Sequence, residues 1–146
     1  MYSSGESTDE QLFKWAKQLH VPLLLACFKD KLNDYRPIAG GYIINMASSN
    51  HDGTHWTALW LEIDDGISKA AYFESFGAPV MLEVSEFCRR FGAPEILYSC
   101  VDVQNIHSAY CGQYCLDFLS FMSRNKHLPF EERYRLFLHQ FRFSCC

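Results

Sequence analysis

The chain has 146 residues, a formal net charge of −4 and 49% hydrophobic residues. This length and composition predict one globular domain spanning residues 1–146. The acidic balance gives no general attraction to nucleic acid, because such binding depends on clustered Lys and Arg. No apolar run has the length of a membrane span and the N-terminus has no secretion signal, so we expect a soluble protein inside a cell or a particle.

The N-terminal part of the chain predicts two helices and a loop. A capping box begins at Thr8 and apolar residues follow it at helical spacing, so we expect a first helix from Asp9 to His20. Pro22 interrupts this helix. We interpret the apolar segment Leu23–Leu32 as a second short helix, and Asn33–Gly41, which holds Pro and glycines, as a loop.

The middle of the chain predicts an antiparallel hairpin. The segment Gly41–Met46 has the composition of a short buried strand, and His55–Ile63 alternates between two faces in the manner of a longer one. An Asp-Asp-Gly turn then leads into a returning strand, Ser68–Glu74. Because the two strands run antiparallel, we expect His55 and Glu74 to lie at the same edge of the sheet.

The second half predicts three helices and one more strand. Leu82–Phe91 is amphipathic and is followed by Gly92, a residue typical of helix C-termini. We expect a strand at Glu95–Val103 and helices at Ala109–Asn125 and Glu131–Phe141. Together these elements predict an α+β fold, in which helices flank a small, mixed and mostly antiparallel sheet.

Cys111, followed by Gly112, stands at the expected start of the Ala109–Asn125 helix. A thiol there feels the positive end of the helix dipole, which favours the thiolate. Gly112 leaves room for another chain near the sulfur, and Gln104, seven residues earlier, can return an amide N–H as an oxyanion donor. These parts suit acyl transfer, although a lone cysteine of this kind is more often a buried structural residue.

His55, Glu74 and Cys111 form a candidate catalytic set. Cysteine–histidine catalysis needs a base within hydrogen-bond reach of the sulfur and a third group that orients the imidazole. His55 can be the base and Glu74 the orienting acid if the cysteine helix docks at that edge of the sheet. His51 stays open as a competing base, and Asp102 as a competing acid.

The seven cysteines do not predict a disulfide framework, because their number is odd and no secretion signal precedes them. Four residues with i, i+4 spacings could form a metal site: His51, His55, Cys111 and Cys115. We disfavour this site because the two histidines lie in a loop-to-strand region, where the spacing does not bring both rings to one side. We therefore expect no metal and no other cofactor.

Three short motifs occur in a fixed order along the chain. They are His55-Trp56, Tyr72–Gly77, and Gln104 followed seven residues later by Cys111-Gly112. Together they resemble adenain, the adenovirus-type processing protease, which belongs to the clan of ubiquitin-like-protein proteases. The resemblance extends from about Leu12 to Met122. It implies a cysteine-protease fold whose nucleophile lies at a helix N-terminus.

The resemblance also implies a role for each matched residue. The roles of nucleophile, general base, orienting acid and oxyanion-hole side chain fall to Cys111, His55, Glu74 and Gln104, respectively. Trp56 is similar to the tryptophan of the clan that flanks the substrate channel. Such an indole wall, with Gly112 beside it, would admit small residues such as glycine at the scissile bond, in a substrate held as extended backbone.

The implied activity is that of a cysteine endopeptidase that matures viral capsid precursor proteins, acting as a monomer in the virion and in the cytoplasm or nucleus of the infected cell. The adenovirus enzymes are activated by a disulfide-linked peptide and by DNA. Neither activator is transferred, because Cys100 lacks the matching spacing and the net charge is acidic, although a local basic face of Arg133, Arg135 and Arg142 stays open. An acyltransferase with the same triad and a non-catalytic binding module remain alternatives.

Overall fold

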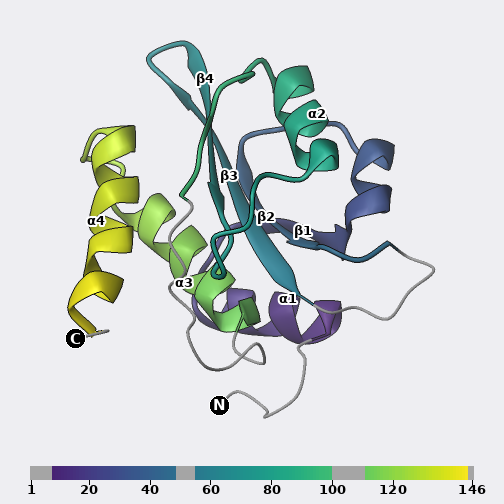
Figure 1. The fold of residues 1–146 in the computed structure, drawn as a ribbon, viewed down its shortest axis with the longest axis horizontal. Helices are drawn as coiled ribbons and strands as arrows, with labels where there is room; N and C mark the ends of the chain where they lie inside the picture. The colour runs from purple at the N-terminus through teal and green to yellow at the C-terminus, as the bar shows by residue number, and fades with distance from the viewer. Residues whose placement is uncertain (1–7, 49–54, 100–110, 145–146) are drawn as a thin grey trace.

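The computed structural model of the chain describes residues 8–48, 55–99 and 111–144 (Figure 1). Within these residues the strands are β1 (Leu23–Phe28), β2 (Gly40–Asn45), β3 (Trp56–Asp64), β4 (Ile67–Phe73) and β5 (Ile96–Leu97). The helices are α1 (Asp9–Gln18), the 3-10 helix η1 (Lys29–Asp34), α2 (Leu82–Phe91), α3 (Cys111–Arg124) and α4 (Phe130–Ser144). None of the described helices combines the length and the apolar character needed to cross a membrane.

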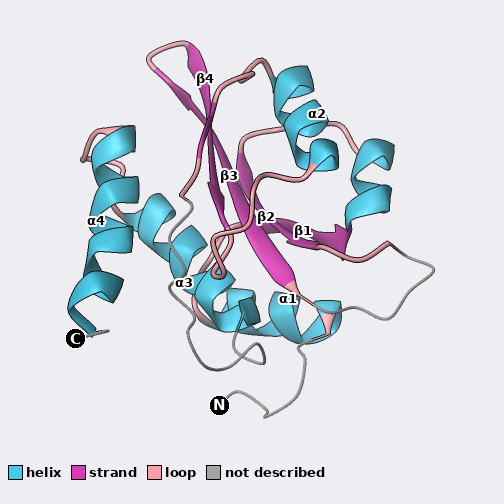
Figure 2. Cartoon of the chain, in the orientation of Figure 1, coloured by secondary structure: helices cyan, strands magenta, loops and turns pink. Residues whose placement is uncertain are grey.

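The five strands form one sheet in the order β1-β2-β3-β4-β5. Neighbours pair antiparallel in the centre, at β2–β3 and β3–β4, and parallel at both edges, at β1–β2 and β4–β5. Helices α1, α3 and α4 cover one face of the sheet, and α2 and η1 cover the other (Figure 2). The predicted α+β fold with a mixed sheet between helices is therefore confirmed.

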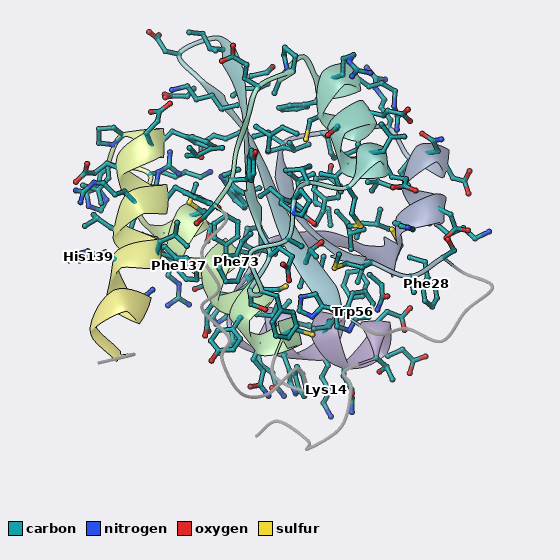
Figure 3. The ribbon with its side chains drawn as sticks, viewed as in Figure 1. Lys14, Phe28, Trp56, Phe73, Phe137 and His139 are labelled. Carbon is teal, nitrogen blue, oxygen red and sulfur yellow. The ribbon has the colours of Figure 1, made fainter. Side chains whose placement is uncertain are left out.

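The alternation of side chains along β3 builds a separate apolar core on each face of the sheet. Trp56 and Trp60 pack in the cluster shared with α1, α3 and α4, whereas Leu59 points into the cluster under α2. From β4, Phe73 meets Phe137 of α4 edge-on, with 5.2 Å between the ring centroids (Figure 3). Helices thus pack against both faces of the sheet, and this packing holds the central hairpin in place.

The central hairpin of β3 and β4 carries His55 and Glu74 at the end opposite to its turn. Its turn consists of Asp65 and Gly66, whose φ angles of 53° and 77° are those of a two-residue turn matched to the twist of the strands. His55 comes directly before β3 and Glu74 directly after β4, so both leave the sheet at the end opposite to this turn. The predicted proximity of these two chain segments is confirmed.

Two of the predicted elements differ from the structure. Leu23–Leu32 is not a helix: its first residues form β1, which pairs in parallel with β2, and η1 begins at Lys29. A short apolar run is compatible with a buried strand or a buried helix, so its periodicity does not decide between them. The strand expected at Glu95–Val103 is confirmed only at Ile96–Leu97, and residues 100–103 lie outside the described part of the chain.

The helix boundaries agree better with prediction where a local signal sets them. The capping box of α1 is present, and α2 ends at Gly92, whose φ of 97° is left-handed. The description of α3 begins at Cys111, and the two residues predicted to precede it in the helix lie outside the described residues.

Candidate active site

His55 and Glu74 are in direct contact at the open end of the β3–β4 hairpin. Nε2 of His55 lies against Oε2 of Glu74, and the two side chains are only 9% and 1% exposed. Two backbone N–H groups hold the carboxylate: Phe76 donates to Oε2 at 3.0 Å and Ala78 donates to Oε1 at 2.6 Å. Both carboxylate oxygens are therefore fixed independently of the imidazole.

The turn after β4 explains how these N–H groups reach the carboxylate. The N–H of Gly77 donates to the backbone oxygen of Glu74 at 3.1 Å, and Gly77 has a φ of 77°, which L-residues rarely adopt. This tight reversal turns the following backbone toward the Glu74 side chain. Asp and Asn side chains commonly bind the backbone two residues further on in turns, and the longer Glu74 side chain does the same here.

The surroundings favour the charged forms of both side chains. Burial alone would lower the pKa of His55, but hydrogen bonding and negative charge from Cys111 and Glu74 outweigh it and raise the pKa to about 9. Burial would likewise raise the pKa of Glu74, but the hydrogen bonds from His55, Phe76 and Ala78 lower it. Both shifts favour an imidazolium that faces a carboxylate.

Cys111 lies at the N-terminal end of α3, as the sequence predicted, and is 4% exposed. Its sulfur accepts a hydrogen bond from the backbone N–H of Trp56 at 3.3 Å. Trp56 directly follows His55, so the strand that carries the imidazole also supplies a donor to the sulfur. This donor and the positive end of the α3 dipole both stabilise negative charge that develops on the sulfur. Gly112 is buried in the first turn of the helix.

The second ring nitrogen of His55, Nδ1, is buried and has no hydrogen-bond partner of standard geometry among the described residues. Glu74 occupies Nε2, so Nδ1 is the nitrogen left to exchange a proton. Cys111 lies near enough to influence the pKa of His55, although Nδ1 and the sulfur do not form a hydrogen bond of standard geometry. Catalytic hydrogen bonds of this type are often long without substrate and shorten when it binds.

Several predicted site residues cannot be placed. Gln104, the competing base His51 and the competing acid Asp102 lie outside the described residues, so their roles stay predictions. Among the residues that the structure does describe, no group of three or more His, Cys, Asp or Glu is arranged to hold a metal ion. The indole of Trp56 is only 8% exposed, and its part in a substrate channel also stays a prediction.

The local basic face considered for the C-terminal helix is not formed by its first two arginines. Arg133 is 1% exposed and binds Glu62 through both terminal nitrogens, at 2.8 and 2.5 Å. Arg135 is paired with Glu132 on the surface of α4. The side chain of Arg142 lies outside the described residues. Arg133 is therefore a buried structural residue that joins α4 to β3 through its ion pair with Glu62.

Phe76 and Ala78, for which the sequence predicts no role, both contact the site. The Phe76 ring lies over the His55 imidazole, with 4.6 Å between centroids and 34° between planes. The available signal was an aromatic residue in a predicted turn, two positions after the proposed acid. Its contact with His55 depends on the turn after β4 folding back over the start of β3, which local sequence does not encode.

No family model and no curated protein matches the sequence. Among solved structures, the chain is similar to the pS273R protease of ASFV, with a TM-score of 0.58, 16% identity and 90% of this chain covered. It is also similar to the Xanthomonas campestris effector XopD bound to ubiquitin, with a TM-score of 0.54, 11% identity, and coverage of 86% of this chain and 78% of the other.

The fold is that of the ubiquitin-like-protein protease clan. The resemblance found in the sequence is thereby confirmed at the level of fold. The chain covers 62% of the length of the ASFV protease.

Proposed function

We propose that this chain is a cysteine endopeptidase in which Cys111, His55 and Glu74 form the catalytic triad. The observation that carries the proposal is the buried His55–Glu74 pair beside a cysteine at a helix N-terminus. An oriented imidazole and a sulfur supplied with hydrogen-bond donors are what nucleophilic acyl transfer requires. A fold shared with cysteine proteases adds support.

In the first half of the proposed reaction, the proton of the Cys111 thiol is held on Nδ1 of His55, so the sulfur acts as a thiolate beside an imidazolium. The carboxylate of Glu74 stabilises this imidazolium, and the sulfur attacks the carbonyl carbon of the scissile bond. Negative charge then develops on the carbonyl oxygen. We assign its stabilisation to the backbone N–H of Cys111 and to an amide N–H of Gln104.

The second half releases the two products. The imidazolium of His55 gives its proton to the leaving nitrogen, the C–N bond breaks, and the acyl group remains on Cys111 as a thioester. His55 then removes a proton from water, whose oxygen attacks the thioester carbon. The C–S bond breaks, the sulfur regains the proton from His55, and the carboxylic acid product leaves.

For the substrate, we propose protein chains cleaved beside small or glycine residues, and in particular viral capsid precursors processed in virions or infected cells. The similarity in fold to a protease of ASFV favours a viral setting, and the fold shared with XopD, whose structure holds bound ubiquitin, favours protein substrates. Gly112 at the start of α3 leaves little bulk beside the sulfur, which suits close approach of an extended backbone.

The proposal is tested by incubating the protein with a peptide library and with candidate capsid precursors in heavy-oxygen water. Mass spectrometry should find cleavage beside Gly or another small residue, with heavy oxygen in the new carboxyl group. The Cys111→Ala variant should leave the same sequences intact. Equal cleavage by this variant, or intact substrates with both proteins, would count against the endopeptidase.

Two alternatives predict different outcomes in the same assay. An acyltransferase with this triad would pass the acyl group to a Lys or Ser of a partner instead of to water, so acetyl-CoA would add the mass of an acetyl group to a protein. A non-catalytic binding module would retain peptides without changing their mass. The buried Glu74–His55 pair favours catalysis over simple binding. Burying an ion pair carries a desolvation penalty, and peptide binding alone does not require such a pair.

A further inference from the structure

The aromatic ring of Phe76 covers one face of the His55 imidazole. The ring centroids are 4.6 Å apart and the ring planes are inclined by 34°. A cation within about 6 Å of an aromatic centroid is attracted by the negative face of the ring. The raised pKa of His55 favours its positively charged form, and the contact places that form against an aromatic face.

The position of Phe76 is not explained by ordinary core packing. Its side chain is 41% exposed, and it belongs to neither of the two apolar clusters that pack against the sheet. It lies in the turn fixed by Gly77, and its own backbone N–H donates to the Glu74 oxygen that contacts His55. One residue therefore contacts the acid through its backbone and the base through its side chain.

We propose that Phe76 is a positioning residue whose ring holds the His55 imidazole in place and favours its protonated form. The described titratable groups that act on His55 are Glu74, after β4, and Cys111, on α3. Phe76 is a neutral residue whose ring contacts the same imidazole. The inference depends on the proposed function only in treating His55 as the catalytic base.

Removing the Phe76 ring has two opposing effects. Loss of the aromatic face destabilises the imidazolium and lowers the pKa of His55, whereas entry of water relieves its burial and raises that pKa. Leucine retains most of the apolar cover but has no aromatic face, so Phe76→Leu isolates the first effect. Tyrosine retains the ring, so Phe76→Tyr should behave like the native protein.

The test is an NMR titration of histidine ring carbons in the free protein, with the His55 signal assigned from its loss in His55→Asn. Phe76→Leu should lower the pKa of His55 by roughly 0.5 to 1 unit. Phe76→Tyr and the matched control Phe13→Leu, which alters an aromatic residue of similar exposure on α1, should leave it unchanged. A His55 titration in Phe76→Leu that coincides with the native curve would overturn the inference.

Because the titration needs no substrate, it separates this inference from the proposed function. A lowered pKa in Phe76→Leu supports the positioning role even if the protein cleaves no peptide. Where cleavage is observed, the same variant should lower kcat with little change in KM, and Phe76→Tyr should restore it. A change confined to KM would identify Phe76 as a substrate contact and overturn the positioning role.

Discussion

Glu74 and His55 lie 19 residues apart in the chain, yet their side chains meet in the interior through Oε2 and Nε2. The β3–β4 hairpin brings them together, and two backbone N–H groups hold the carboxylate in place. An imidazole fixed in this way can present only Nδ1 to a reaction partner. The geometry therefore assigns different tasks to the two ring nitrogens.

Replacing Glu74 with glutamine should remove the charge while keeping the shape of the side chain. We expect the pKa of His55 to fall from about 9 toward its ordinary value of 6.5. We also expect kcat/KM to fall by roughly 100- to 10,000-fold, less than when the base itself is removed. Histidine NMR and peptide cleavage measure the two effects. Glu131→Gln, at an exposed carboxylate on α4, is the matched control, and an unchanged His55 titration in Glu74→Gln would contradict the assignment.

The pair should also make folding stability depend on pH in a defined direction. The pKa of His55 is raised from 6.5 to about 9, so its contribution is complete below pH 6.5 and is lost as the pH rises through 9. The pKa of Glu74 is lowered, so its contribution is present above pH 4.5 and is lost as the pH falls further. In urea unfolding, the free energies of unfolding of the native protein and of His55→Asn should therefore differ most between pH 4.5 and pH 6.5. A stability difference between the two proteins that increased above pH 9 would contradict this prediction.

Selective alkylation should distinguish Cys111 from the other described cysteines. Burial raises the pKa of Cys27 and of Cys88 to about 12, and raises that of Cys115 well above its usual value. These three are therefore unreactive thiols near neutral pH. The cysteines outside the described residues are removed in the variant Cys100→Ser, Cys145→Ser, Cys146→Ser. In this background iodoacetamide should modify Cys111 first, as peptide mapping can check, and preferential modification of Cys115 would contradict the site.

The ion pair between Arg133 and Glu62 should matter for stability. Arg133 also donates to the backbone oxygen of Met122 at 2.8 Å, so it ties α4 to both α3 and β3. Arg133→Ala leaves a largely buried carboxylate without its cation and should cost about 3–5 kcal/mol in urea unfolding. The control Arg135→Ala removes an exposed pair and should cost at most about 1 kcal/mol. Equal costs for the two variants would show that the buried pair contributes no more than the surface pair.

Sequence signals were sufficient where they were local. Thr8 set the start of α1, Gly92 the end of α2, and the Asp-Gly turn the β3–β4 hairpin. Once the hairpin was known, strand direction alone placed His55 near Glu74. These features could be predicted because each depends on a few adjacent residues with special backbone or capping preferences.

Long-range contacts account for what could not be predicted. Leu23–Phe28 became an edge strand because it pairs in parallel with β2, a partner that its own composition does not specify. The bond from the Trp56 N–H to the Cys111 sulfur joins residues 55 positions apart and depends on how α3 docks on the sheet. The Phe76–His55 contact likewise requires the turn after β4 to fold back over the start of β3.

The most direct measurement of the central claim is kcat/KM for a cleaved peptide in four proteins: native, Cys111→Ala, His55→Ala and the double variant. If the sulfur and the imidazole act as one unit, each single variant should lose at least about 1,000-fold, and the double variant should lose little more. If the loss in the double variant equals the product of the two single losses, the two residues act independently, which would contradict a shared catalytic role. Activity that survives in Cys111→Ala would contradict the account.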